Sequence, residues 1–575
     1  MAKFKDILII VAILILSIVI SIDIFKPGLF VMHDDQQATR LFLFDEAIRG
    51  GQFPPRWVNS LGFGFGYPLF NFYPPFVYMF GELFHLLGFD FISSIKIVFF
   101  VSIIASGFGM YIFSKELFGR ISGLVAAAAY LLVPYRAIDV YVRGALAESF
   151  AFVWLPLIFW AFLRLFNTGK TKYLLLSSVF LFLLMITHNL IFIPFMLILP
   201  IYLFFLFVQN NFKKTLIFKS VLAFVFAAGL SAFFWLPSLL EKKYTMVDEL
   251  LITDLASYKI HFVFTKQLWD WVWGFGGSAK GLADGISFQI GKIHLLASLA
   301  AATIVIYQII INLKEGRRYL FKHLLILVFA FLLIFSAFMS TNYSKLIWDK
   351  LTFLSYLQFP WRFLIFTSLF SALLMGALIY LLKVKILKIF FAATLLFALL
   401  SMNYKIFKPQ YIRDNALNLT LEDYIKWDVS KSSFEYVPKG FPLKREAAGY
   451  NTADITKLDL PSKKAEILFG NAQIHSISST PSKTLLKISS SSPSQLRLNT
   501  FYFPGWKAYV NGKEVQIDDQ NKYKLITLTV PIGDSDILVK FENTHARLAA
   551  NYISIISLLL LIPLSLKKWQ ILGKI

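Results

Sequence analysis

The sequence predicts a polytopic all-α membrane protein with about twelve transmembrane helices and one β-rich domain outside the bilayer. Of its 575 residues, 57% are hydrophobic and only 16% are charged, and the mean hydropathy is +0.65. A soluble chain cannot bury so much apolar side chain. Long apolar runs recur through the first 400 residues, and a polar, β-prone stretch precedes the last run.

Apolar runs of about 18 residues or more predict the spanning helices. The long run at 173–207 is divided in two, because a Thr-His-Asn break interrupts it. The first run follows two lysines and has no small-residue cleavage site, so we expect it to remain as the first helix. The expected spans lie near residues 6–24, 92–114, 121–138, 147–166, 172–187, 190–208, 217–239, 290–312, 321–340, 361–383, 386–404 and 548–566.

The net charge of +22 is concentrated in short segments between alternate spans. This placement orients helices with both termini in the cytoplasm, and it does not indicate a nucleic-acid partner. The basic segments lie at 115–120, 164–172, 213–219, 314–322, 383–388 and 567–574. The same orientation brings every long, irregular segment to the outer face. Cysteine is absent, which excludes thiol catalysis, disulfides and Cys-ligated metals.

Composition divides the chain into three parts. Residues 1–404 form the transmembrane domain, with a large first outward loop at 25–91. Residues 405–547 contain short alternating stretches separated by Ser, Pro, Gly or Asp, which is typical of a small antiparallel β-sandwich. Asn511-Gly512 predicts a two-residue hairpin turn within that region. Residues 548–575 hold the last span and a basic cytoplasmic tail.

The first outward loop carries the strongest catalytic candidates. Asp34 and Asp35 follow His33 shortly after the first helix. Adjacent acidic groups at a bilayer boundary lose hydration and repel each other, so the pair needs a reason. One reason is general-base catalysis, in which a carboxylate takes a proton from an attacking hydroxyl. The alternative is N-capping of a helix at 36–49, and spacing alone leaves both open.

Two arginines form a second group at the same predicted face. Arg136 and Arg143 are seven residues apart and share a face if this region is helical. Guanidinium groups suit bidentate binding of phosphate. An ion-pair lattice with Asp139 and Glu148 is the open alternative.

Three further motifs are less specific. His188-Asn189 interrupts a span, and a structural histidine is the default interpretation over ligand binding. Arg362 begins another span from the outside, where it meets a lipid headgroup or a donor phosphate. The Phe503-Pro-Gly-Trp506 segment suits either a sugar-stacking surface or, as we favour, an aromatic plug of the core.

A divalent metal is chemically compatible with the His and Asp side chains, but no spacing requires one and no metal site is assigned.

The motifs together resemble the bacterial membrane proteins labelled "6-pyruvoyl-tetrahydropterin synthase-related". That label looks like a misnomer, because such proteins resemble the GT-C superfamily of polytopic membrane glycosyltransferases. The C-terminal segment Tyr502 to Gly512 also looks like that of a GT-C-like group linked to cell-wall glycosylation. The segments that carry the first resemblance are 33–40, 51–57, 66–70, 72–75, 135–148, 187–189 and 358–362.

The resemblance implies a GT-C-like fold with an extracytoplasmic C-terminal domain, in the bacterial inner membrane. It implies transfer of a sugar from a polyprenyl-phosphate donor to a hydroxyl of an envelope glycan, lipid or protein, with Asp34 as the general base. Relatives often carry a small residue at the position of Asp35, so the choice between the two remains open. Donor-phosphate or substrate binding is expected from His33, Arg40, Arg56, Arg136, Arg143, Glu148, His188, Asn189 and Arg362.

Two other function classes fit the same composition. A transporter or flippase for lipid-linked saccharides predicts internal repeats and ionisable residues at the bilayer midplane, and the sequence shows neither. A non-catalytic scaffold for the outward β domain does not require the intact His-Asp and Pro-Trp-Arg motifs. The glycosyltransferase interpretation is therefore preferred.

Overall fold

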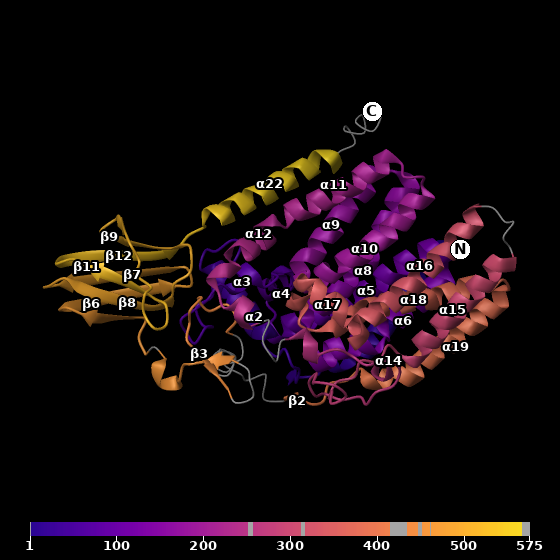
Figure 1. The fold of residues 1–575 in the computed structure, drawn as a ribbon, viewed down its shortest axis with the longest axis horizontal. Coiled ribbons are helices and arrows are strands. Elements are labelled where there is room, and N and C mark those ends of the chain that lie inside the picture. Colours follow the sequence, from indigo (N-terminus) through magenta and orange to yellow (C-terminus); the bar gives the residue numbers. More distant parts are fainter. Residues whose placement is uncertain are drawn as a thin grey trace.

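The computed structural model describes residues 2–250, 257–311, 317–413, 434–446, 451–460 and 462–565. A large helical body carries a β-rich C-terminal region at one end (Figure 1). The predicted basic tail at 567–574 and part of the basic segment at 314–322 lie outside the described residues.

Each expected span contains a helix. Within the described residues, nine helices are long and apolar enough to cross a membrane, or up to eleven if each of two bent pairs is one span, against the twelve expected. The helices at the twelve expected spans are α1 (Ala2–Ser21), α5 (Phe91–Phe118), α6 (Arg120–Leu131), α8 (Leu146–Thr168), α9 (Thr171–Thr187), α10 (Asn189–Gln209), α11 (Lys214–Leu230), α15 (Lys292–Ile311), α16 (Arg317–Ser340), α18 (Leu364–Leu381), α19 (Lys385–Asn403) and α22 (His545–Ser565).

Two of the expected spans are bent. The first pair joins α6 to α7 (Pro134–Ala137) and the π-helical turn η2 (Ile138–Arg143) at 45°, at a proline that has no amide hydrogen for the helical ladder. The second joins α11 to α12 (Ala232–Glu241) at 69°. There the Ser231 hydroxyl donates to the carbonyl of Ala227 at 2.7 Å and competes with the backbone ladder.

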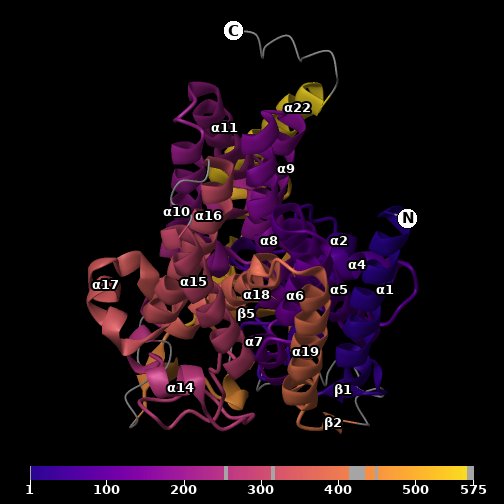
Figure 2. The same ribbon diagram turned by 90° about the vertical axis from the view of Figure 1, so that its right-hand side faces the viewer.

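Several connections lie together at one end of the body. Figure 2 shows α14 (Thr265–Trp269), β1 (Leu29–Phe30) and β2 (Ile412–Arg413) at the opposite end from the start of α1 and the end of α22. The remaining short elements are η1 (Ile22–Phe25), α2 (Gln37–Arg49), α3 (Leu69–Phe72), α4 (Phe76–Leu86), η3 (Lys242–Tyr244), α13 (Val247–Leu250), η5 (Tyr258–Ile260), η6 (Asn342–Ser344), α17 (Lys345–Lys350), η7 (Thr352–Leu357), η8 (Pro360–Phe363) and η9 (Tyr404–Ile406).

The C-terminal region is built from antiparallel strands, as predicted. A five-stranded sheet has the order β10-β9-β12-β7-β6, and a three-stranded sheet has the order β11-β8-β5. The strands are β3 (Leu443–Arg445), β4 (Asn451–Ala453), β5 (Ala465–Phe469), β6 (Ala472–Thr480), β7 (Lys483–Ser490), β8 (Ser494–Phe501), β9 (Trp506–Val510), β10 (Lys513–Val515), β11 (Leu525–Val530) and β12 (Gly533–Phe541), with the turn η11 (Lys457–Asp459). Alternate residues of β7 and β8 are buried between the sheets.

The predicted hairpin is confirmed, because Asn511-Gly512 joins β9 to β10 with Val510 opposite Lys513. The aromatic-plug interpretation is also confirmed. Phe503 and Trp506 are buried, and the Trp506 ring packs edge-on against Trp57 of the first loop at 5.3 Å. These rings therefore hold the β-rich region against the first loop and do not form an exposed sugar-stacking surface.

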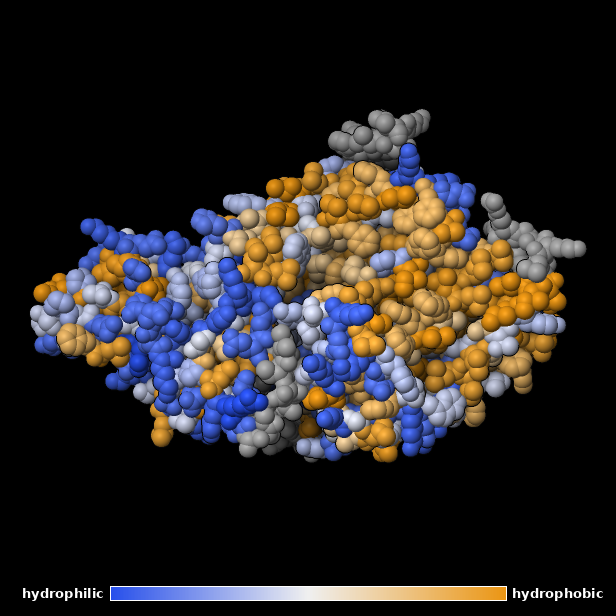
Figure 3. All heavy atoms as spheres, viewed as in Figure 1, coloured by the Kyte–Doolittle hydropathy of each residue, from blue (hydrophilic) through white to orange (hydrophobic). Residues whose placement is uncertain are grey.

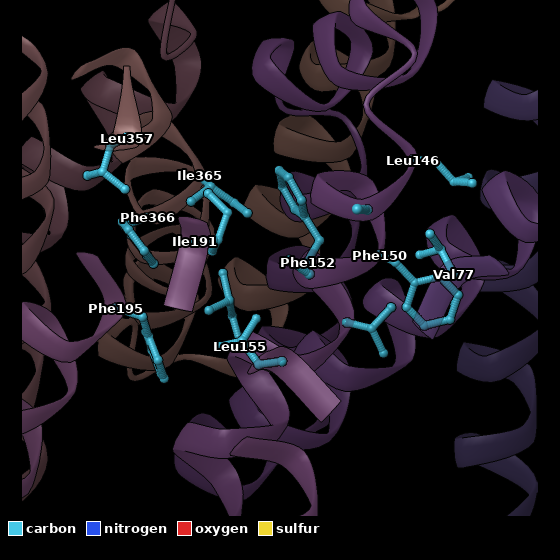
Figure 4. Close-up of a cluster of buried hydrophobic side chains, with 14 of the residues drawn as sticks. Val77, Leu146, Phe150, Phe152, Leu155, Ile191, Phe195, Leu357, Ile365 and Phe366 are labelled. Carbon is cyan, nitrogen blue, oxygen red and sulfur yellow. The ribbon is translucent and has the colours of Figure 1, made fainter. Parts of the chain in front are cut away.

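The helical body and the β-rich region also differ in the hydropathy of their surfaces. Figure 3 shows hydrophobic surface over the helical body and a more hydrophilic surface over the β-rich region. Inside the body, side chains of α8, α10 and α18 interdigitate around Leu155, Ile191 and Phe366 (Figure 4). Close packing of this kind keeps the helix ends in fixed positions.

A buried polar network joins the first loop and the end of α12 to the start of α22, which directly follows the β-rich region. Glu241 at the end of α12 accepts hydrogen bonds from Asn71 (2.9 Å), Arg547 Nε (2.9 Å) and Thr544 (2.7 Å). Arg56 donates to the side-chain oxygen of Asn71 at 2.9 Å. The side chains of Arg547 and Glu241 are 0% and 4% exposed, so each charge depends on its partner for compensation.

Arg547→Ala is expected to lower the free energy of unfolding by about 3–5 kcal/mol, because it leaves the Glu241 carboxylate buried and unpaired. Thermal unfolding of the purified protein in lipid nanodiscs measures the change. The matched control is Arg497→Ala, which breaks a partly exposed pair with Glu466 (2.8 Å) and is expected to cost about 0–1 kcal/mol. Equal losses in the two variants would contradict this account of the network.

Candidate functional site

A cavity of about 740 Å³ lies among the predicted outward connections between the helices. The first loop, η2, the start of α8, the α9–α10 junction, η3, η8 and the segment at 435–436 all contribute to its wall. Eight of the eleven predicted site residues line it: His33, Asp34, Arg40, Arg143, Glu148, His188, Asn189 and Arg362. A second cavity of about 600 Å³ lies on the five-stranded sheet and contains none of them.

Asp34 is placed in the cavity by its backbone. The amide of Asp34 donates to the carbonyl of Arg143 at 2.8 Å, and the amide of His33 donates to that of Val142 at 3.0 Å. The Asp34 side chain is exposed at the cavity wall. The N-cap residue of α2 is Gln36, not Asp34 or Asp35, and its side chain makes no capping hydrogen bond. Asp35 does not line the cavity.

Gly144 allows this backbone approach. It ends η2 in the left-handed region with φ of +64°, and a Cβ built there would lie 2.1 Å from the Met32 sulfur. Met32 directly precedes the His33-Asp34 pair. A larger residue at 144 would therefore displace the segment that carries Asp34.

A buried cluster of charged side chains, Arg143 with Asp139 and Glu148, lies next to the segment that carries Asp34. Arg143 Nη1 donates to Asp139 Oδ1 (2.5 Å) and to Glu148 Oε2 (2.7 Å). Tyr135 donates to the other oxygen of Glu148 at 2.6 Å. Both carboxylates are fully buried, and the guanidinium lies over the Trp361 ring at 4.5 Å. The predicted ion-pair lattice thus exists around Arg143, within the cavity wall.

Arg362 is bound differently from Arg143. Its Nη1 donates to the carbonyl of Leu357 at 2.5 Å, and its Nε is buried without a hydrogen-bond partner. It is 8% exposed. Among the described residues no carboxylate forms an ion pair with it, whereas Lys242 of the same cavity pairs with Asp248 at 3.0 Å. Arg362 and Arg40 are therefore the two cavity arginines for which no ion pair is found among the described residues, and Arg362 is the one beside the Arg143–Trp361 contact.

His188 has a structural contact and also lines the cavity. Its Nδ1 accepts a hydrogen bond from the amide of Ile191 at 3.2 Å, which caps α10. In the neutral ring the hydrogen then lies on Nε2, which is 4.0 Å from Glu148 Oε2. The default structural interpretation is consistent with this contact, and Asn189 follows at the cavity wall.

Arg56 and Arg136 lie elsewhere. Arg56 belongs to the network around Asn71. Arg136 is fully buried between helices, where it donates to Ser106 at 2.6 Å and lies 4.0 Å from the centre of the Phe152 ring. The expectation that Arg136 and Arg143 share a face is wrong, because the π-helical turn changes the angular spacing between them.

The cavity also contains residues that the sequence analysis did not select. They are Tyr73, Lys242, His261, Tyr356, Glu435 and Tyr436. Lys242 follows the end of a predicted span, so its charge at the outer boundary could have identified it as a candidate site residue from the sequence. Glu435 belongs to no motif, and only the tertiary structure brings it to the cavity. In the part of the chain that the structure describes, no three His, Cys, Asp or Glu side chains come together as metal ligands.

Comparisons with known proteins add little at the level of sequence. No protein-family model and no curated protein matches the chain, so the resemblance to the pterin-synthase-related family remains a prediction. Among solved structures, the chain is similar to the mycobacterial arabinofuranosyltransferase AftD and to a mutant of it, with TM-scores of 0.45 and identities of 13% and 16%. The matches cover 72% of this chain but only 28% and 29% of those chains.

The chain therefore spans less than a third of the length of these structures, and similarity at this level assigns no function to it. Its own composition and helices define the class: it is a multi-pass membrane protein with a polar cavity at one end of the helical body.

Gly144→Ala is expected to lower the thermal unfolding midpoint, since the left-handed backbone alone costs an L-residue about 1–2 kcal/mol and the new methyl group meets Met32. Combining it with Met32→Ala removes the contacts with Sδ (2.1 Å) and Cγ (2.6 Å) and leaves only Cβ at 2.8 Å, so the double variant is expected to lose less stability than the sum of the two single losses. Simple additivity, measured by a double-mutant cycle, would contradict the close approach of these residues.

Proposed function

We propose that this chain is a membrane glycosyltransferase of the GT-C type, which transfers a sugar from a polyprenyl-phosphate donor to a hydroxyl of an envelope glycan, lipid or protein. The observation that carries the proposal is a single cavity that contains both the Asp34 carboxylate and the Arg362 guanidinium. A base and an anion-binding group are the two functions that this transfer requires.

In the proposed reaction, Asp34 accepts the proton of the acceptor hydroxyl. The acceptor oxygen attacks the anomeric carbon of the donor sugar and forms the new glycosidic bond. The bond between the anomeric carbon and the phosphate oxygen breaks, and its electron pair stays on the departing polyprenyl phosphate. A single displacement of this kind inverts the anomeric configuration.

Arg362 stabilises the leaving phosphate in this scheme. A guanidinium in the cavity wall presents fixed donors to a phosphate oxygen, and the surrounding low dielectric strengthens the interaction. Arg143 already pairs with Asp139 and Glu148, so its role is to position the wall beside Asp34.

The cavity also offers an apolar edge for the lipid chain of the donor. Leu190, Ile193, Leu239 and Phe353 line it together. Leu239 and Phe353 are 59% and 43% exposed, which places apolar side chains at the rim of a polar cavity. In our proposal these residues contact the isoprenoid units next to the phosphate.

The predicted topology completes the proposal. Short basic segments between alternate spans favour cytoplasmic termini, and the cavity is lined by connections on the other side of those spans, such as the first loop, the α9–α10 junction and η8. We therefore place the reaction on the extracytoplasmic face of a bacterial inner membrane.

Asp34→Asn is expected to reduce sugar transfer about 100-fold or more, because asparagine cannot accept the acceptor proton. The measurement is transfer of label from a panel of polyprenyl-phosphate sugars to an envelope extract by protein in nanodiscs. Asp35→Asn is the matched control and is expected to retain most activity, since Asp35 does not line the cavity. The opposite ranking of the two variants would contradict the assignment of the base. Transfer from no donor by the wild type would favour a transporter or a scaffold.

Arg362→Gln is expected to lower kcat/KM for the donor by about 100-fold, and Arg362→Lys by less, because lysine keeps the charge without the planar donors. Arg49→Gln provides the control, since that side chain is 66% exposed. Steady-state kinetics with varied donor concentration tests the expectation. Unchanged kcat/KM in Arg362→Gln would show that the phosphate binds elsewhere.

A further inference from the structure

The segment around Glu435 is firmly docked on the helical body. The amide of Met246 donates to the carbonyl of Val437 at 3.0 Å, and the amide of Lys439 donates to that of Tyr244 at 2.9 Å. These bonds attach the C-terminal region to the connection that follows α12. The backbone of Glu435 and Tyr436 is therefore held at the cavity.

Aromatic contacts fix the other side of this segment. The Tyr436 ring stacks on Phe72 with centroids 5.1 Å apart, and on Tyr67 at 5.7 Å. Phe72, Tyr73 and Tyr436 all line the cavity. One wall is thus rich in aromatic side chains, contributed jointly by the first loop and the C-terminal region.

Glu435 adds a carboxylate to that wall. Burial raises its pKa, and the positive charge of Arg40 acts in the opposite direction. No cation of the described residues lies within ion-pair distance of Glu435. Arg40 itself lies over the Tyr73 ring at 4.3 Å. The carboxylate consequently has acceptor capacity left for a ligand.

This wall differs chemically from the one that contains Arg362 and His188. A carboxylate repels a phosphate, but it accepts strong hydrogen bonds from hydroxyl groups. Aromatic rings pack against the apolar C–H faces of a sugar, and a guanidinium donates to its oxygens. The combination of Glu435, Arg40 and aromatic rings is suited to a neutral polyhydroxyl ligand.

We propose that Glu435 and Tyr436, with Arg40 and Tyr73, form the subsite for the acceptor sugar, so that the C-terminal region supplies part of the acceptor specificity. This inference rests on the proposed glycosyltransferase function and names the acceptor as a glycan end with free hydroxyl groups. Glu435 binds hydroxyl groups next to the reacting one and positions the acceptor, while Asp34 takes the proton.

The test measures sugar binding separately from transfer. Saturation-transfer difference NMR is recorded with methyl glycosides of the common hexoses and pentoses, on the full-length protein in nanodiscs. The wild type is expected to bind at least one glycoside. Glu435→Gln is expected to weaken that binding about tenfold or more, because a hydrogen bond to a charged acceptor is replaced by a neutral one. Glu435→Asp, which keeps the charge, is expected to recover part of the affinity.

Two matched variants complete the design. Glu446→Gln lies in the same described segment but outside the cavity, and it is expected to bind like the wild type. Arg362→Gln is expected to keep glycoside binding while it loses donor use. The subsite is contradicted if the wild type binds no glycoside, if Glu435→Gln binds as tightly as the wild type, or if Glu446→Gln loses binding equally.

The two proposals fail separately. Glycoside binding that depends on Glu435, together with no transfer from any donor, supports the subsite and contradicts the transferase. Transfer by Glu435→Gln with an unchanged KM for the acceptor supports the transferase and overturns the subsite.

Discussion

The buried guanidinium of Arg143, held between Asp139 and Glu148, is the interaction on which the arrangement of the site depends. Three charges so far from water are tolerated only when each is paired and hydrogen bonded. Meeting that requirement fixes the π-helical turn to the start of α8. The carbonyls at 142 and 143 then receive the amides of His33 and Asp34, so the position of Asp34 follows from the charge cluster beneath it.

A second buried ion pair, between Glu241 and Arg547, fixes two larger parts of the chain relative to each other. It joins the end of α12 to the start of α22, while aromatic rings of the first loop and of the β-rich region interlock beside it. The Arg547 guanidinium also donates to the carbonyls of Pro504 (2.7 Å) and Glu542 (3.2 Å), which ties the end of the β-rich region to this pair. The backbone bonds of Val437 and Lys439 with Met246 and Tyr244 hold Glu435 and Tyr436 at the cavity.

The cavity consequently has two chemically distinct walls made by distant parts of the chain. Arg362, at a helix end, provides the cation for an anionic group, and the charge of the neighbouring Glu148 is compensated by Arg143. Glu435 and the neighbouring aromatic rings form the wall suited to hydroxyl groups, and Asp34 is exposed in the same cavity. A transfer between an anionic lipid donor and a polyhydroxyl acceptor requires such a division, because each substrate needs groups that would repel or poorly bind the other.

The sequence by itself determined the helical segments, the β-rich composition and the 511–512 hairpin, and eight of the eleven site residues that it predicted line the cavity. These are properties of short stretches, since apolar length and strand alternation are read directly along the chain. Only the tertiary structure decided that Arg136 and Arg56 lie in internal contacts, that two spans bend, and that Glu435 reaches the cavity. The reason is physical: which charges meet depends on how helices pack and where a π-helical turn or a proline redirects the chain, and no local pattern records those distances.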